Sequence, residues 1–180
     1  LHESHPYIYL DRTGRFLLGA SYGANLVTVN PVGADGRVGE TMQVIPTAVN
    51  AHAIITDNTN RFVFVPHLGT DQIFQFRFDA KTGRLAANTP PVVQMKSGTG
   101  PRHIIISADN KFAYLLNELT AVVTTLSLDA KTGLLTQVSN AIKAFYDATV
   151  EIGLDRQVTT FTLSDFGRTF QPAGTGAAVG

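Results

Sequence analysis

The chain has 180 residues, enough for one domain of ordinary size, and aliphatic and aromatic residues make up 44% of it. Basic and acidic residues both number 14, and the resulting zero net charge argues against nucleic-acid and membrane-surface partners, which need a basic excess. Without cysteine there are no disulfides or thiolate metal sites, and no ligand spacing supports a zinc site. No apolar run reaches the length of a membrane span. No signal segment is visible, although the sequence begins without Met, so an upstream start with a signal stays open.

Three consecutive segments share one sequence pattern: residues 9–38, 54–85 and 104–135. A phenylalanine recurs at intervals of 46 and 50 residues, as Phe16, Phe62 and Phe112. A glycine recurs at intervals of 47 and 50 residues, as Gly36, Gly83 and Gly133. A period in the forties with strand-like patterning is typical of the blades of a β-propeller.

Each segment predicts four antiparallel strands in the same order. A short apolar strand leads through a polar turn to a second strand, whose nearly continuous apolar residues predict burial on both faces. The third strand alternates with period two, as a half-exposed strand does, and the repeated glycine makes the turn into a more polar fourth strand. Asp11, Asp57 and Asp109 recur in the first turns, and we interpret them as turn residues bonded to their own backbone.

The predicted fold class is all-β, with three four-stranded propeller blades over residues 1–141. Propellers close their rings with about four to eight blades, so three make an incomplete ring. Its uncovered apolar faces predict self-association. The pattern changes at about residue 141. Residues 144–154 predict an amphipathic helix and 157–166 a strand, so we predict a helix–strand tail of unrelated pattern over 142–180.

Charged residues mark the strand ends of the third segment, "GTGPRHIIISADNKFAYLLNEL" (98–119). Arg102 and His103 precede one apolar run, and Glu118 follows the next, whereas the two sister segments lack the Arg and the Glu. Strand ends of successive blades approach one another around a propeller axis, so His52 of the second segment can join them. A plain ion pair between blades is the alternative for these residues, and it stays open.

The three segments resemble the seven-bladed β-propeller lactonases, the family of the propeller-type 6-phosphogluconolactonase and the fungal 3-carboxy-cis,cis-muconate cyclase. The resemblance rests on the stretches "DRTGRFLLGASYGANLVTV", "NAHAIITDNTNRFVFVPHLGTDQIFQFRFDAKTGRL" and "GPRHIIISADNKFAYLLNEL", and it covers three of seven blades. The tail, with "TTFTLSDFGRT", resembles an uncharacterised exported bacterial family of the sulfatase-like superfamily, which predicts a chimera.

The resemblance implies a hydrolase that opens a small anionic sugar-acid lactone without a metal or an organic cofactor. It gives catalytic roles to His52, Arg102 and Glu118, with His52 or Glu118 as acid or base and Arg102 as the anion clamp. His103 and His67 are the candidate substrate contacts, and the family often has Asp where this sequence has His67. A lactonising cyclase and a catalytically silent propeller fragment are the alternatives. The lactonase part suggests the cytoplasm, and the tail suggests export.

Overall fold

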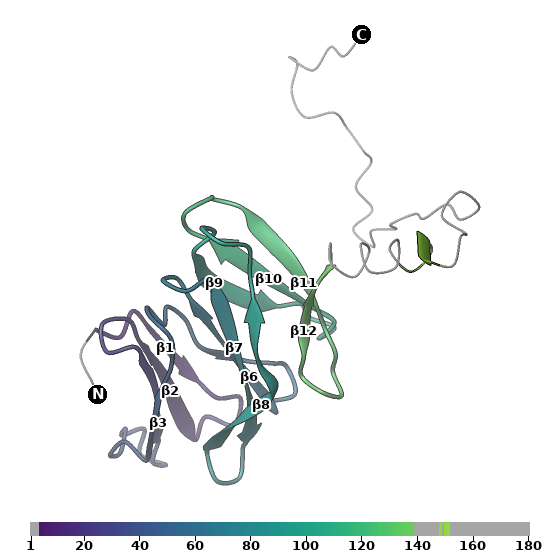
Figure 1. Cartoon of the computed structure of the whole chain (residues 1–180). Helices are drawn as coiled ribbons and strands as arrows, with labels where there is room; N and C mark the ends of the chain where they lie inside the picture. The colour runs from purple at the N-terminus through teal and green to yellow at the C-terminus, as the bar shows by residue number, and fades with distance from the viewer. Residues whose placement is uncertain (1–3, 139–147, 149, 152–180) are drawn as a thin grey trace, which may run out of the picture. The chain divides into compact units, whose positions relative to one another are not determined.

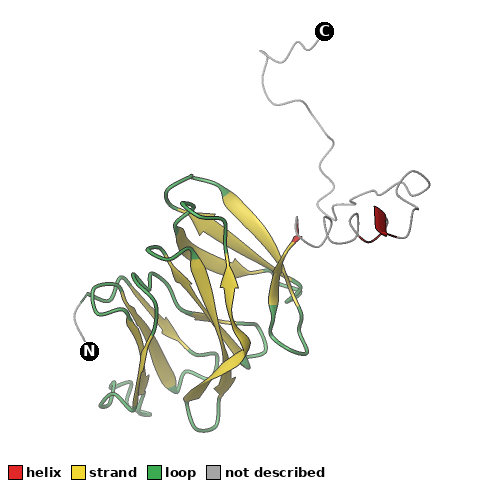
Figure 2. Ribbon diagram, viewed as in Figure 1, coloured by secondary structure: helices red, strands yellow, loops and turns green. Residues whose placement is uncertain are grey.

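The computed structural model describes residues 4–138, 148, 150 and 151. Residues 4–138 belong to one compact unit, Leu1–Ala141, and they form three four-stranded antiparallel sheets that follow one another along the chain (Figures 1 and 2). This confirms the predicted all-β fold of three propeller blades. The predicted helix over 144–154 and strand over 157–166 fall outside the described residues, apart from Ala148, Val150 and Glu151, which are helical. No helix among the described residues is long and apolar enough to cross a membrane.

Every sheet is a meander in which the four strands pair in chain order. The first blade consists of β1 (Tyr7–Leu10), β2 (Phe16–Ser21), β3 (Leu26–Pro31) and β4 (Gln43–Pro46). The second consists of β5 (Ile55–Thr56), β6 (Phe62–His67), β7 (Gln72–Asp79) and β8 (Arg84–Gln94). The third consists of β9 (Pro101–Ile106), β10 (Phe112–Asn117), β11 (Val123–Leu128) and β12 (Leu135–Gln137).

The hydrophobic core lies between blades. One buried cluster joins the first two blades and a second cluster joins the second and third. Val63 and Val65 of β6 face the first cluster while Phe62 and Phe64 face the second, so β6 is buried along its whole length, as predicted. Strand β10 differs, because its residues alternate between buried and more exposed. The reason is that its outward face has no further blade against it in the described part of the chain.

Glycine and phenylalanine form a repeated contact between neighbouring blades. A Cβ atom on Gly83 would lie 2.3 Å from the ring of Phe16, and one on Gly133 would lie 2.1 Å from the ring of Phe62. Both glycines have φ near +70°, where residues with a side chain are strained. In the first and second blades, the first aromatic ring of the second strand therefore packs onto the glycine turn of the next blade.

A carboxylate in the first turn of a blade ties that blade to its neighbour. Asp57 accepts hydrogen bonds from the backbone amides of Arg61 (2.8 Å) and Phe62 (3.0 Å) and from Asn110 Nδ2 of the third blade (3.1 Å). Asp11 accepts one from Asn60 Nδ2 in the same way (2.7 Å). Burial opposes ionisation of Asp57, but the hydrogen bonds from Thr59 and the backbone outweigh it and hold its pKa below the usual value.

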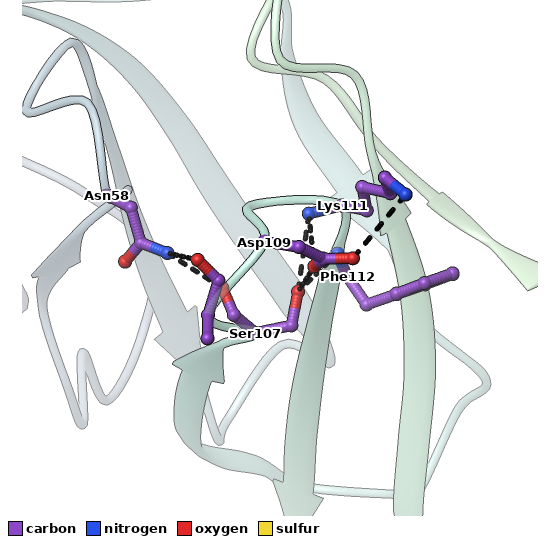
Figure 3. Close-up of polar contacts among 6 residues, drawn as sticks. Asn58, Ser107, Asp109, Lys111 and Phe112 are labelled. Atoms are coloured by element: carbon purple, nitrogen blue, oxygen red, sulfur yellow. Dashed lines mark hydrogen bonds and ion pairs between the residues drawn. The ribbon is translucent and has the colours of Figure 1, made fainter. Parts of the chain in front are cut away.

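The third blade corrects one sequence-based assignment. The backbone amide of Ser107 bonds Phe112 O, as the amides of Asp11 and Asp57 bond the carbonyls of their own phenylalanines. Ser107 therefore occupies the repeated position, and Asp109 lies two residues further along, exposed, accepting a hydrogen bond from Ser107 Oγ (2.6 Å; Figure 3). Ser107 and Asp109 lie two positions apart in the same turn, and Asp109 still bonds its own backbone as expected, accepting a hydrogen bond from the amide of Lys111 (3.1 Å).

Asp57→Ala is expected to lower the free energy of unfolding by about 2–3 kcal/mol, because it leaves buried backbone amides and Asn110 without an acceptor. Asp109→Ala, at the position that the sequence suggested as equivalent, should cost less than about 0.5 kcal/mol. Urea unfolding of both variants measures the difference. Equal losses would contradict the assignment of Asp57 as the inter-blade acceptor.

Candidate functional site

The candidate site residues come from two blades whose strand ends converge. His52 precedes β5, Arg102 lies in β9, and Glu118 directly follows β10. The backbone amide of His52 donates to Pro66 O (3.0 Å), and that of Glu118 donates to Gly100 O (2.7 Å). The main chain thus fixes the position from which each side chain starts.

A β-bulge sets the direction of Arg102. The pairing of β9 with β10 passes from His103↔Leu116 to Pro101↔Asn117, so Arg102 is the extra residue without a cross-strand partner. A bulge locally bends a strand and redirects a side chain. Here it places the guanidinium of Arg102 beside His52 of the preceding blade and Glu118 at the end of the neighbouring strand.

The loop before the bulge is held by the second blade. The carboxylate of Asp71 accepts hydrogen bonds from the backbone amides of Gly98 and Gly100, both at 2.8 Å, and from Thr99 Oγ1 at 3.3 Å. Gly100 has φ +66°, and a Cβ there would lie 2.7 Å from Leu119 Cγ. These contacts fix the backbone that leads into β9 and so help to position Arg102.

Arg102, His52 and Glu118 form a compact polar group. Arg102 Nε lies 2.8 Å from Glu118 Oε2 and 3.1 Å from His52 Nε2. Glu118 Oε2 and His52 Nε2 are themselves 4.0 Å apart. Because a guanidinium only donates, His52 Nε2 carries a lone pair, and we assign the ring proton to Nδ1. His52 Nδ1 is buried with no hydrogen-bond partner among the described residues. Among those same residues, the terminal amino groups of Arg102 have no recorded partner, and its side chain is 41% exposed.

His52 and the neighbouring His103 have lowered pKa values, which favours their neutral forms. Burial lowers the pKa of His52, and the nearby charge of Arg102 lowers it further, while Glu118 acts in the opposite direction. The pKa of His103 is lowered for the same reasons in the same order. Neutral imidazoles beside a guanidinium can accept or relay a proton, while the guanidinium binds an oxyanion.

Two tyrosines complete the surroundings, and neither was among the candidate residues selected from the sequence. The ring of His52 packs edge to face against the rings of His103 and Tyr22, with centroid distances of 5.1 and 5.7 Å. The ring centroids of Tyr7 and His103 are 5.8 Å apart. The amide of Tyr22 bonds Ser4 O as that of Glu118 bonds Gly100 O, so Tyr22 is the first-blade equivalent of Glu118. Aligning the ends of the second strands residue by residue would have revealed it. We call His52, Arg102, His103 and Glu118 the inter-blade cluster.

His67 has a different environment from the cluster. Its side chain is fully buried at the end of β6, with Nδ1 2.9 Å from Val65 O and its ring 4.5 Å from Phe74. Ser21 and Asn117, likewise buried, end β2 and β10 at the corresponding place. No surface of His67 is left for a substrate in this structure, so we leave His67 out of the proposed substrate contacts.

His67 should make stability depend on pH in a defined window. Burial lowers its pKa from 6.5 to about 4, so below pH 6.5 the unfolded chain takes up a proton that the folded chain does not. The free energy of unfolding should therefore fall by about 3 kcal/mol from this residue as the pH drops from 6.5 to 4, and then level off. The carboxylates whose pKa is lowered affect the free energy of unfolding mainly at pH values below that window.

His67→Asn introduces the residue that the third blade has at this place. It should remove most of the fall in the free energy of unfolding between pH 6.5 and 4. Urea unfolding between pH 7 and 4 checks the expectation, with a smaller remainder left by His52 and His103, whose pKa values are also lowered. An unchanged slope in the variant would show that His67 does not titrate in this way.

Fold and cluster together define a β-propeller with a polar group of one arginine, one glutamate and two histidines where strand ends of successive blades meet. The chain belongs to the lactonase family of seven-bladed β-propellers: the family model "Lactonase, 7-bladed beta-propeller" matches residues 1–165. The match confirms the family expected from the three repeats and runs past residue 141. The predicted change of origin at that residue, and the tail's resemblance to a second family, stay predictions.

Relatives and solved structures agree with this family. A 6-phosphogluconolactonase of Pectobacterium carotovorum is 38% identical over 135 residues, 75% of this chain and 40% of the relative. One of Serratia proteamaculans is 36% identical over 135 residues, with the same coverage. The structure of the Pseudomonas aeruginosa periplasmic gluconolactonase is 34% identical with a TM-score of 0.66, over 73% of this chain and 40% of that one. A putative 6-phosphogluconolactonase of Bacteroides fragilis is 28% identical with a TM-score of 0.64, over 73% and 41%. The chain thus spans about 40% of the length of these proteins.

Proposed function

We propose that the protein to which this chain belongs is a lactonase that hydrolyses a small anionic sugar-acid lactone. The observation that carries this proposal is the arrangement of Arg102, with Nε held between Glu118 and His52 while its terminal amino groups are free among the described residues. An arginine in this state can receive a carboxylate, a phosphate or a developing oxyanion. The names of the relatives support a sugar-acid lactone as the substrate.

The geometry favours Glu118 as the base and His52 as the residue that orients Arg102. The lone pair of His52 Nε2 already faces the Arg102 N–H group, and His52 is only 8% exposed. The side chain of Glu118 is 42% exposed and can reach water. In the proposed step Glu118 takes a proton from water, the water oxygen bonds to the lactone carbonyl carbon, and Arg102 stabilises the oxyanion. The ring C–O bond then breaks, and the leaving oxygen takes up the proton.

The terminal amino groups of Arg102, free among the described residues, favour a phosphorylated lactone over a neutral one, although the carboxylate of Glu118 balances the charge of the guanidinium. A guanidinium binds phosphate bidentately, and the two neutral histidines beside it add no competing charge. The relatives named 6-phosphogluconolactonase agree with this choice, and the neighbour named periplasmic gluconolactonase represents the alternative. With a phosphorylated substrate we place the activity in the cytoplasm.

A direct assay tests the proposal. Purified chain, and the longer protein if this chain is part of one, is given 6-phosphogluconolactone or gluconolactone, and acid release is measured above the spontaneous rate. We expect hydrolysis with a preference for the phosphorylated lactone. Hydrolysis that persists unchanged in Glu118→Gln would reject the assignment of the base, and a longer protein with no activity on either lactone would reject the function.

A second candidate is a catalytically silent unit that serves to bind or to build an assembly. The observation in its favour is that the chain spans about 40% of its relatives and forms three blades. We also propose that the chain self-associates to cover its apolar blade faces. Sedimentation velocity tests this part separately, and a monomer at every accessible concentration would reject it.

A further inference from the structure

The two internal blade junctions are built from the same parts. In each, a phenylalanine of the earlier blade lies on a glycine of the later one: Phe16 on Gly83, and Phe62 on Gly133. The arginine before that phenylalanine stacks over its ring and donates to a carbonyl in the glycine turn of the later blade. Arg61 Nη2 reaches Ala130 O at 2.6 Å, and Arg15 reaches Ala80 O. A blade junction therefore has a projecting half and a receiving half.

The third blade presents a projecting half with no receiver in the described part of the chain. Phe112 stands where Phe16 and Phe62 stand, and Lys111 replaces the arginine before it (Figure 3). Lys111 Nζ lies 3.7 Å from Asp109 Oδ2, and its side chain is 69% exposed. Ile105 and Val123, on the same outward face by strand alternation, are 63% and 58% exposed.

The first blade presents the matching receiving half. Gly36 has φ +77°, like Gly83 and Gly133, but no described atom lies within 4 Å of the place of its Cβ. It lines a hollow of about 660 Å³ together with Leu10, Leu17 and Val38. Leu10 and Val38 are half exposed. The hollow lies where a phenylalanine ring lies at each internal junction.

Charge and polar side chains also match between these two end faces. The backbone amide of Val32 donates to Arg15 O, and that of Leu128 donates to Lys111 O, so Val32 and Leu128 occupy equivalent positions. Ala34 therefore corresponds to Ala130. The next residue is Asp35 in the first blade but Lys131 in the third. A lysine reaching Ala34 O would thus meet the carboxylate of Asp35, which within the chain lies 3.6 Å from Arg37 Nε.

The polar tie between blades is lost from both end faces at once. Ser107 replaces the acceptor aspartate in the third blade. Gly14 replaces the donor asparagine in the first blade. Its amide donates to Asp11 O, just as the amide of Asn60 donates to Asp57 O and that of Asn110 donates to Ser107 O. Joining the two faces therefore leaves neither an unpaired aspartate nor an unpaired asparagine at this place.

We propose that the third blade of one chain docks on the first blade of a second copy. Phe112 fills the hollow at Gly36, and Lys111 binds Ala34 O and Asp35. The described blades of two copies joined by two such contacts number six, within the range in which propellers close, whereas those of one or three copies number three or nine, outside that range. This inference rests on the self-association proposed above and is independent of lactonase activity.

Two variants and one control test the docking by sedimentation velocity. Phe112→Ala removes the projecting ring, and Gly36→Leu fills the hollow. Gly98→Leu has the same backbone strain, because Gly98 has φ +78° and open space around it, but it lies in the loop before β9. We expect the wild-type chain and Gly98→Leu to form dimers, and each of the other two variants to raise the dimer dissociation constant by about 100-fold or more.

Mixing identifies the head-to-tail arrangement. Phe112→Ala keeps an intact hollow and Gly36→Leu keeps an intact ring, so a mixture of the two should form a dimer that neither forms alone. A wild-type dimer that neither variant weakens would overturn the docking while self-association stands. A mixture that remains monomeric would also overturn it. A wild-type monomer would overturn both docking and self-association, and leave the lactonase assay unaffected.

Discussion

Gly133→Ala is expected to destabilise the propeller unit far more than Gly36→Ala. Both glycines have φ above +70°, so alanine costs about 1 kcal/mol of backbone strain at either site. Within one chain, only at Gly133 does the new methyl group meet a neighbour, because its place lies 2.1 Å from Phe62 Cδ1, so the comparison is made at protein concentrations where the chain is monomeric. Overpacking adds about 1–3 kcal/mol, which gives a loss of about 2–4 kcal/mol against about 1. Urea unfolding of the two variants measures both values.

A double-mutant cycle shows whether the ring of Phe62 causes that difference. Phe62→Ala alone should cost about 3–5 kcal/mol, since a buried ring is removed. Combined with Gly133→Ala, the loss should be about 1–3 kcal/mol smaller than the sum, because the methyl group then has room. Additive losses would mean that the junction does not depend on this contact. Equal losses for Gly36→Ala and Gly133→Ala would mean the same.

Arg102→Ala is expected to lower kcat/KM for lactone hydrolysis by about 100- to 1000-fold in any preparation with lactonase activity. This is the size of effect seen when a donor to a developing oxyanion is removed. A fall in kcat alone would assign Arg102 to the oxyanion, and a rise in KM alone would assign it to the anionic group of the substrate. Arg102→Lys keeps the charge without the planar fork, so it should retain part of the activity.

Arg77→Ala serves as the matched control for this experiment. Arg77 is an exposed arginine on β7, outside the inter-blade cluster, and its loss should leave kcat/KM unchanged. Unchanged activity of Arg102→Ala would reject the role proposed for this residue. The inter-blade cluster would then be a structural ion pair, the alternative that the sequence left open.

Local sequence signals predicted the blades well because each blade repeats them. The spacing of Phe16, Phe62 and Phe112, and of the three turn glycines, followed from period and pattern alone. Charged residues confined to the third repeat also drew attention to Arg102 and Glu118, which the structure places 2.8 Å apart. That contact joins neighbouring strands of the third blade, whereas the contact of Arg102 with His52 of the second blade depends on how blades converge, which the repeat architecture predicted.

Features that depend on strand register were not accessible from the sequence. The bulge at Arg102 arises from the pairing of β9 with β10, and no residue in "GPRHIII" marks it. The exposure of β10 depends on which blade covers it, whereas its apolar content resembles that of β6. His67 was a candidate substrate contact within a stretch that resembles the family, which often has Asp at this position. Its burial follows from the side of the strand on which it lies, which only the register determines.

The inter-blade cluster and its two tyrosines draw on three consecutive blades: Tyr7 and Tyr22 from the first, His52 from the second, and Arg102, His103 and Glu118 from the third. No blade outside this group supplies any of these side chains. The residues proposed for catalysis thus lie within three successive blades, so a change in the number of other blades in a ring would leave these side chains together.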